Sequence, residues 1–329
     1  MLRRSDRGWA QEALLQGSPD SNFGFAVALS ADGRTLAVGA TRQESSGGMS
    51  RTGAVSVFRH VAANWAQEAL LEPSNAAAAG FASFHVGFSV TLDADGTTLA
   101  VGAPGHSNAR GEAFVFRRRT NFWTQDAALK APVPSPGDAF GCSVSLDARG
   151  TRLAVGAAGN KALSGAAYLF EKKEDVWTAG ASFKVSNTSD FFGTSISLSV
   201  DGTTLAIGAE GAQDNAGAVH VFHSTDTTWK QETRLEPSRP NTKFGSRVSL
   251  SADGTTLAVA TWFDGAVSVY QRQGIEWIAG RPLVGVESRP TRAVALAISA
   301  DGTLLAVGYQ HQRQNADDPS TGTVRLVAR

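Results

Sequence analysis

The chain of 329 residues has almost no cysteine, no surplus of charge of either sign and no long apolar run. Its single cysteine, Cys142, can form no disulfide within the chain and leaves the redox compartment open. The 30 basic and 30 acidic residues balance, which argues against nucleic acid or an anionic membrane as the main partner. No apolar segment approaches a membrane span and the first residues lack an apolar signal core, so we expect a soluble chain without membrane insertion.

Helix-period segments are also scarce, and glycine is abundant at 35 residues, which favours an all-β fold. Residues 192–211 show the repeated unit best. Apolar and small residues alternate in its first half, Asp201-Gly202 predicts a turn, and the alternation resumes at Leu205, so the unit is a predicted β-hairpin. Its spacing of roughly 50 residues is typical of β-propeller blades. The hairpin opens at Phe23, Val86, Phe140, Phe192, Phe244 and Arg292.

Each hairpin is followed by two further predicted strands, of which the second is anchored by a tryptophan in most units. The sixth unit has only three predicted strands, whereas the chain begins with an unpartnered tryptophan strand at Trp9 to Leu15. We therefore predict one domain over residues 1–329, a six-bladed β-propeller of four-stranded antiparallel blades closed by pairing of the N-terminal strand with the last blade. The predicted blades span about 23–71, 86–129, 140–183, 192–235, 244–283, and 292–329 together with 9–15.

The repeat resembles a known family through two sequence cassettes that recur in register, Phe-Gly and Gly-Ala. Examples are Phe140-Gly141 with Gly156-Ala157 and Phe192-Gly193 with Gly208-Ala209. The pattern is similar to the FG-GAP repeat of bacterial integrin-like proteins and of the integrin α-subunit propeller. The resemblance implies a cell-adhesion-like module that binds a ligand or partner, with an extracellular or cell-surface location. Integrin propellers differ in having seven blades and Asp-rich calcium loops.

The sequence offers neither a metal site nor a catalytic motif. Ca²⁺ requires six to eight oxygen ligands, whereas the Ser-Ala-Asp-Gly turns supply one or two carboxylates each and one copy carries Arg149 at the recurrent Asp position. We therefore expect structural turns, no metal and no cofactor. The six histidines are scattered and no Gly-x-Ser-x-Gly elbow precedes a helix, so we expect no catalytic residues and no enzyme activity.

Strand direction places the loops between second and third strands, and those between blades, on one rim of the propeller. These loops vary in length, and variable loops on a repeated scaffold usually carry specificity. The sequence breaks its own pattern on this rim in the last two units, where Arg247 replaces a small residue and Arg292 replaces phenylalanine. Arginine and aromatic side chains are typical of binding hot spots. The predicted ligand-binding residues are Arg247, Trp262, Phe263, Asp264, Arg292, Tyr309 and His311.

The leading hypothesis is a monomeric, non-catalytic module that recognises a protein or a glycan. One alternative is an enzyme with its site at the mouth of the axial channel, because a fold does not determine a function. Another is a structural repeat module within a larger surface protein. The candidate residues themselves also have an alternative interpretation, in which Arg247 and Trp262 serve only the scaffold.

Overall fold

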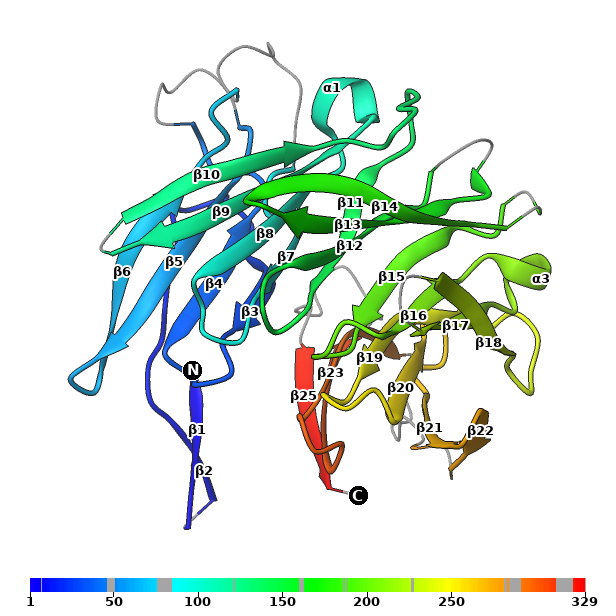
Figure 1. Cartoon of the computed structure of the whole chain (residues 1–329). Helices are drawn as coiled ribbons and strands as arrows, with labels where there is room; N and C mark the ends of the chain where they lie inside the picture. The colour runs from blue at the N-terminus through cyan, green and yellow to red at the C-terminus, as the bar shows by residue number, and fades with distance from the viewer. Residues whose placement is uncertain are drawn as a thin grey trace.

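The structure is a computed structural model that describes residues 1–6, 8–45, 51–75, 85–120, 122–159, 163–185, 187, 189–225, 228–280, 283, 291–311 and 322–328. It is an all-β, six-bladed β-propeller whose antiparallel blades follow one another around an axis (Figure 1). The predicted fold class and blade number are confirmed. The helices α1 (His106–Ala109) and α3 (Ala212–Asn215) are short turns between strands, and no described helix has the length and apolar character needed to cross a membrane.

Five blades contain four described strands and the sixth contains three. Within each blade the strands pair in chain order, so each strand lies beside its neighbour in sequence. Blade 1 comprises β3 (Phe23–Leu29), β4 (Thr35–Ala40), β5 (Ala54–Val61) and β6 (Asn64–Leu71), and blade 2 comprises β7 (Ser89–Leu92), β8 (Thr98–Ala103), β9 (Glu112–Arg119) and β10 (Phe122–Leu129). Blade 3 comprises β11 (Phe140–Leu146), β12 (Arg152–Ala157), β13 (Ala166–Lys173) and β14 (Val176–Lys184), and blade 4 comprises β15 (Phe192–Leu198), β16 (Thr204–Ala209), β17 (Ala218–Thr225) and β18 (Thr228–Leu235). Blade 5 comprises β19 (Phe244–Leu250), β20 (Thr256–Thr261), β21 (Val267–Gln273) and β22 (Glu276–Ala279), and blade 6 comprises β23 (Thr291–Ile298), β24 (Leu304–His311) and β25 (Gly322–Ala328).

The Asp-Gly turn explains why each hairpin forms where the sequence predicts it. In blade 4 the Asp201 carboxylate accepts a hydrogen bond from the Thr203 N–H at 2.9 Å, and Gly202 adopts a φ of 72°, which glycine reaches at little cost. The apolar residues of β15 then face the preceding blade. They share one buried core cluster with residues of blade 3, including Ala154, Leu169, Ile196 and Leu198.

Neighbouring blades approach most closely at a pair of glycines. A Cβ atom built on Gly156 of blade 3 would lie 2.1 Å from the carbonyl oxygen of Gly193 in blade 4, and one on Gly208 would lie 2.0 Å from that of Gly245 in blade 5. Both distances are shorter than any real Cβ contact, so backbone meets backbone at these points. This contact explains why the Phe-Gly and Gly-Ala cassettes recur together.

A second link, farther along the blade, joins an acid of one blade to a tryptophan and a base of the next; we call it the acid–Trp–base clasp. Glu68 of β6 accepts hydrogen bonds from Trp123 Nε1 at 3.0 Å and from Arg118 Nε at 2.9 Å. Arg118 and Trp123 are cross-strand partners in blade 2, so the clasp is defined by strand register. The same arrangement joins Asp126 to Lys172 and Trp177, and Glu232 to Arg272 and Trp277.

The predicted pairing of the N-terminal strand with the last blade is not formed in this structure. Residues Gly8–Gln11 form β2, which pairs with β1 (Leu2–Ser5) in a separate two-stranded sheet, and within the described residues β25 pairs only with β24. The sequence prediction missed β1 because Leu-Arg-Arg-Ser shows no apolar alternation. A hairpin between adjacent segments closes a much shorter loop than pairing with a strand about 300 residues away.

The junction between blades 6 and 1 therefore differs from the others. Val27 and Leu29 of β3 are 63% and 50% exposed, whereas the equivalent Val144 and Leu146 of blade 3 are 8% and 7% exposed. The glycine contact is also missing, because a Cβ on Gly24 would meet nothing within 4 Å. Among the described residues, the face of blade 1 that corresponds to a covered face in the other blades is left open.

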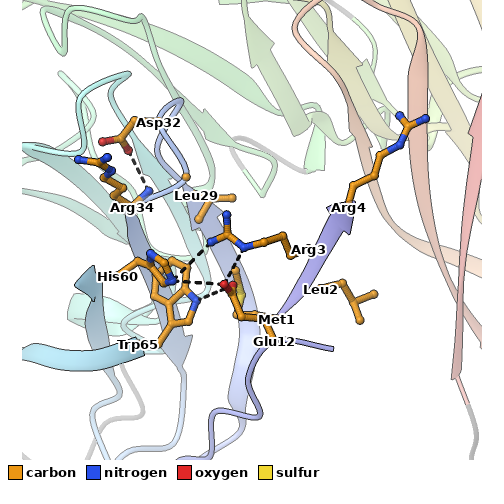
Figure 2. A pocket seen from close by; sticks show the side chains of 11 residues that line it. Met1, Leu2, Arg3, Arg4, Glu12, Leu29, Asp32, Arg34, His60 and Trp65 are labelled. Carbon is orange, nitrogen blue, oxygen red and sulfur yellow. Dashed lines mark hydrogen bonds and ion pairs between the residues drawn. The ribbon is translucent and has the colours of Figure 1, made fainter. Parts of the chain in front are cut away.

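The N-terminal segment nevertheless makes a clasp with blade 1. Glu12 accepts hydrogen bonds from Arg3 Nε at 2.6 Å and Trp65 Nε1 at 3.2 Å, and its carboxylate lies 3.2 Å from His60 Nε2. Figure 2 shows these side chains around a pocket of about 450 Å³, with Arg4 extending away from the others. Glu12 thus takes the place that the acid of a preceding fourth strand takes elsewhere.

The glycine contact gives a first prediction. Gly156→Ala forces a Cβ against the backbone of the next blade, and overpacking of this kind costs about 1–3 kcal/mol of unfolding free energy. Gly308→Ala is the matched control, because the three atoms nearest to its Cβ all belong to Ala295 of its own blade, the closest being the Ala295 Cβ at 3.1 Å. Thermal and urea unfolding of both variants should show a clear loss for Gly156→Ala alone. Equal losses would show that the contact does not set the blade spacing.

The clasp gives a second prediction. Glu68→Gln removes the charge that Arg118 pairs with at 2.5 Å, and we expect a loss of about 1–3 kcal/mol in unfolding free energy. Glu276→Gln, at an exposed position of β22, removes the same charge outside any clasp and should change stability by less than about 0.5 kcal/mol. Urea denaturation measures both values. If the clasp contributes nothing to stability, the two variants will have equal unfolding free energies.

Candidate functional site

The two rims of the propeller differ in how uniform their loops are. One rim carries the Asp-Gly turns, and successive turns are joined by main-chain hydrogen bonds of 2.9 to 3.0 Å, from Ala31 to Ala94, Ala94 to Ala148, Ala148 to Val200, Val200 to Ala252 and Ala252 to Ala300. The opposite rim carries the loops between second and third strands and those between blades; we call it the variable rim. Its described loops range from the helical turns α1 and α3 to the short connection after β20.

The Asp-Gly turns use their carboxylates to hold the backbone. Hydrogen bonds from the Ser299 hydroxyl and the Thr303 N–H lower the pKa of Asp301 to about 2, and the same turn chemistry lowers the pKa of Asp253. Within the described part of the chain, His, Cys, Asp and Glu side chains form no group of three or more that could hold a metal ion. The carboxylates of Asp253 and Asp301 therefore stabilise the backbone of their own turns.

On the variable rim, Trp262 lies between the arginines of two blades. The Cζ atom of Arg292 in β23 is 5.4 Å from the centroid of the Trp262 ring, and that of Arg247 in β19 is 6.0 Å away. Beside them, Lys243 Nζ lies 5.7 Å from the centroid of Phe263. Distances up to about 6 Å are typical of cation–π contacts. We call Lys243, Arg247, Trp262, Phe263 and Arg292 the cation–aromatic cluster.

The loop that presents Trp262 is held by its own hydrogen bonds. The Asp264 carboxylate accepts hydrogen bonds from the Thr261 hydroxyl and from the Ala266 N–H, the latter at 3.1 Å. The main-chain N–H of Trp262 donates to the Thr242 carbonyl at 3.1 Å, and Thr242 lies in the loop that precedes β19. Asp264 is thus a turn residue of this short loop, and the loop fixes the position of the indole ring.

Arg247 replaces a serine that links blades elsewhere in the ring. In blades 3 and 4 the hydroxyls of Ser143 and Ser195 each donate to a glycine carbonyl of the next blade at 2.7 Å. At the equivalent position, Arg247 Nε donates to the Val294 carbonyl of blade 6 at 2.9 Å, and its Nη1 donates to the Ser246 carbonyl at 2.6 Å. Burial lowers the pKa of the Arg247 guanidinium, while Glu210 acts in the opposite direction. Arg247 therefore serves the scaffold and also brings a charge to the rim.

The structure brings some of the seven predicted site residues together on the rim and places others elsewhere. Arg247, Trp262 and Arg292 come together, and Phe263 lies next to them with 47% of its surface exposed. Tyr309 is buried in the core shared by blades 5 and 6, where burial raises the pKa of its phenol. His311 ends β24, and its side chain lies outside the described residues.

Sequence reasoning missed Lys243, which lies over Phe263 and 3.7 Å from the Glu210 carboxylate. Lys243 is the residue just before the Phe-Gly pair. The residue at this position has a positive φ in each of blades 1 to 5. This position carries a different residue each time, namely Asn22, His85, Ala139, Phe191 and Lys243. Variation at a fixed place on the rim was the signal that could have identified it.

A second polar cluster on the same rim bears on the enzyme alternative. Buried His106 and Glu112 occupy positions that are alanines in blade 4, Ala212 and Ala218. His106 Nδ1 lies 2.8 Å from the Ser107 hydroxyl and 3.3 Å from the Glu112 carboxylate. A catalytic triad needs the hydroxyl and the carboxylate on different ring nitrogens. In this structure both partners lie at the same nitrogen, so the cluster does not have triad geometry.

Comparisons with known proteins agree with the repeat and the fold. The FG-GAP repeat family matches residues 123–170 and 185–222, and no curated protein sequence matches the chain. Among solved structures, the periplasmic gluconolactonase PpgL of Pseudomonas aeruginosa superposes with a TM-score of 0.63 at 16% identity, over 99% of this chain and 94% of that one. The β-propeller domain of Myceliophteria thermophila Cps50 (Swd1) gives 0.59 at 13% identity, over 92% and 81%. Identities this low establish the fold alone.

The dual role of Arg247 gives a third prediction. Arg247→Ala removes a hydrogen bond between blades 5 and 6 and should lower the unfolding free energy by about 1–2 kcal/mol. Arg149→Ala, at a position 71% exposed on the Asp-Gly rim, should cost less than about 0.5 kcal/mol. Chemical denaturation measures the unfolding free energy of both variants. An Arg247→Ala protein as stable as Arg149→Ala would mean that the guanidinium does not link the blades.

Proposed function

We propose that this chain, an FG-GAP repeat β-propeller, is a non-catalytic, adhesion-like module that binds a protein or glycan partner through its variable rim at blades 5 and 6. The observation that carries the proposal is the placement of Trp262 within cation–π range of Arg247 and Arg292. Tryptophan and arginine are the side chains most enriched at binding hot spots. The module acts as a monomer in this proposal.

The position of the cluster supports a binding role beyond the scaffold. A serine is sufficient to link blades 3 and 4, and blades 4 and 5, so the link alone does not require an arginine at position 247. The arginine keeps the link and adds a positive charge next to Trp262. Arg292 adds a second charge in blade 6, next to Ala293, which pairs with Tyr309 in the register that Phe244 has with Thr261 in blade 5. Both arginines thus supply the same chemistry at one place.

An enzyme remains the second candidate function, because one protein that shares the fold is a periplasmic gluconolactonase. At 16% identity this similarity transfers no residues to the present chain. The His106–Glu112 cluster is the arrangement in the described residues that most resembles catalytic machinery, and its geometry does not fit a triad. A binding role therefore has the better support.

The fourth prediction tests the proposed surface. Trp262→Ala and Phe263→Ala should each weaken binding to a partner selected on glycan and protein arrays by at least about tenfold, while the melting temperature shifts by only a few degrees. Phe122→Ala is the control, because Phe122 is 59% exposed at the start of β10, at the end of the blade that carries the Asp-Gly turns. Binding that survives both rim changes, or that is lost equally in Phe122→Ala, would place the interaction elsewhere.

A further inference from the structure

We infer that a pocket next to the cation–aromatic cluster takes a basic side chain, lysine or arginine, of a protein partner. The inference rests on the proposed function and specifies the partner as a protein that presents a positive charge. The pocket has a volume of about 390 Å³ and lies on the variable rim at blade 4. We call it the Asp190 pocket; its lining includes Asp190, Phe191, Gln213, Asp214 and Asn215.

The Asp190 pocket adjoins the surface proposed above. Its two sides are the loop before β15 and the helical turn α3, and the Gly211 N–H joins them by donating to the Asp190 carbonyl at 3.0 Å. On the other side of α3, the main-chain N–H of Lys243 in the cation–aromatic cluster donates to the Asn215 carbonyl at 2.9 Å. A partner that binds at the cluster therefore lies next to the pocket.

Asp190 is a buried acid without a hydrogen-bonded partner for its carboxylate. The residue is 5% exposed, and its carboxylate accepts no hydrogen bond from the residues that the structure describes. Asp190 acts electrostatically on His220, but burial lowers the pKa of His220, so this ring is neutral at pH 7. Buried polar groups normally have hydrogen-bond partners, because desolvation without one is costly. A ligand in the pocket would supply the donors.

The charge of the lining selects a cation. Asp190 and Asp214 bring two negative charges, and the lining contains no lysine, arginine or histidine. The amide nitrogen of Gln213 donates to the Glu236 carboxylate at 2.8 Å, which leaves the Gln213 amide oxygen as a further acceptor. Ammonium and guanidinium groups only donate hydrogen bonds, so they match a site that offers mainly acceptors.

The aromatic ring of Phe191 favours an organic cation over a metal ion. Phe191 takes the variable position before the Phe-Gly pair, as Lys243 does in blade 5. Its ring lies against the backbone of Gly211, because a Cβ atom built there would be 2.5 Å from the Phe191 Cδ2 atom. An aromatic face attracts an ammonium or guanidinium group. Ca²⁺ needs six to eight oxygen ligands, and the lining brings only two carboxylates.

The different exposure of the two acids favours a charged group on a long stem. Asp190 is buried, whereas Asp214 and Asn215 are exposed. Lysine and arginine carry their charge at the end of several methylene groups, which can pack along an apolar surface such as the half-buried ring of Phe191. A side chain of this kind reaches Asp190 while the backbone that carries it stays outside the pocket.

The fifth prediction uses trilysine and triarginine peptides with blocked termini as probes, and Nε-acetylated trilysine as the matched neutral ligand. Acetylation keeps the methylene stem and removes the charge. We expect calorimetry on the full chain to show binding of at least one cationic peptide. Acetylation, and the Asp190→Asn variant, should each weaken that binding by at least about tenfold.

Asp138→Asn is the matched control for Asp190→Asn. Asp138 is the acid at the same position of blade 3 and is 1% exposed, but it does not line the pocket, so the affinity should be unchanged. Asp214→Asn changes an exposed residue of the pocket and should also weaken binding, which keeps the test valid if Asp190→Asn does not fold. Melting temperatures check that each variant is folded.

Four results would overturn the inference. Equal binding of trilysine and its acetylated form would mean that the pocket does not recognise charge. Tighter binding of a glucosamine trimer than of either peptide would indicate a glycan, and a melting temperature raised by CaCl₂ in the parent chain but not in Asp190→Asn would indicate a metal site. Absence of peptide binding at millimolar probe, or equal weakening by Asp138→Asn, would remove the pocket as a site. The array test of Trp262→Ala would still decide on the proposed function by itself.

Discussion

The backbone contact between glycines of successive blades is the constraint on which the rest of this propeller depends. Gly156 and Gly208 lie so close to the carbonyls of Gly193 and Gly245 that no side chain fits, and this sets the spacing of the blades. Where the glycine pair is absent, between blades 5 and 6, the residues that link the two blades also differ. Ala260 stands in place of the second-strand glycine of blade 5 and packs in one cluster with Ala293 of blade 6, and the serine link of the earlier blades is replaced there by Arg247.

In the acid–Trp–base clasp, too, the residues of two neighbouring blades differ together. Between blades 3 and 4 the acid position is Gly180 and the base position is Ser224, so both charged members are absent together. An aromatic contact takes their place, because Phe183 of blade 3 packs edge-on against Trp229 of blade 4 at 5.7 Å between ring centroids. A charge left without its partner at a half-buried junction would cost more than the apolar contact that replaces the pair.

The sequence was sufficient to predict the hairpins, the blade count and the grouping of Arg247, Trp262 and Arg292, because each of these depends on a position that repeats or visibly fails to repeat. It was insufficient where an alternative partner was close in sequence, as in the pairing of β2 with β1. It was also insufficient for side-chain direction. Tyr309 looked like part of the rim, but alternation along β24 directs its ring into the core. Lys243 was missed because the position before Phe-Gly has no residue preference.

The candidate site is inseparable from the junction that carries it. Trp262 and Arg247 belong to blade 5, whereas Arg292 belongs to blade 6, so the distance between the two guanidinium groups depends on how these blades pack. The hydrogen bond from Arg247 to Val294 fixes that packing and orients the guanidinium at the same time. A repeat protein can vary its loops without disturbing its blades, but a site that spans two blades requires a change in the link itself. The loss of the glycine pair at this junction, with an arginine in place of the serine, meets that requirement.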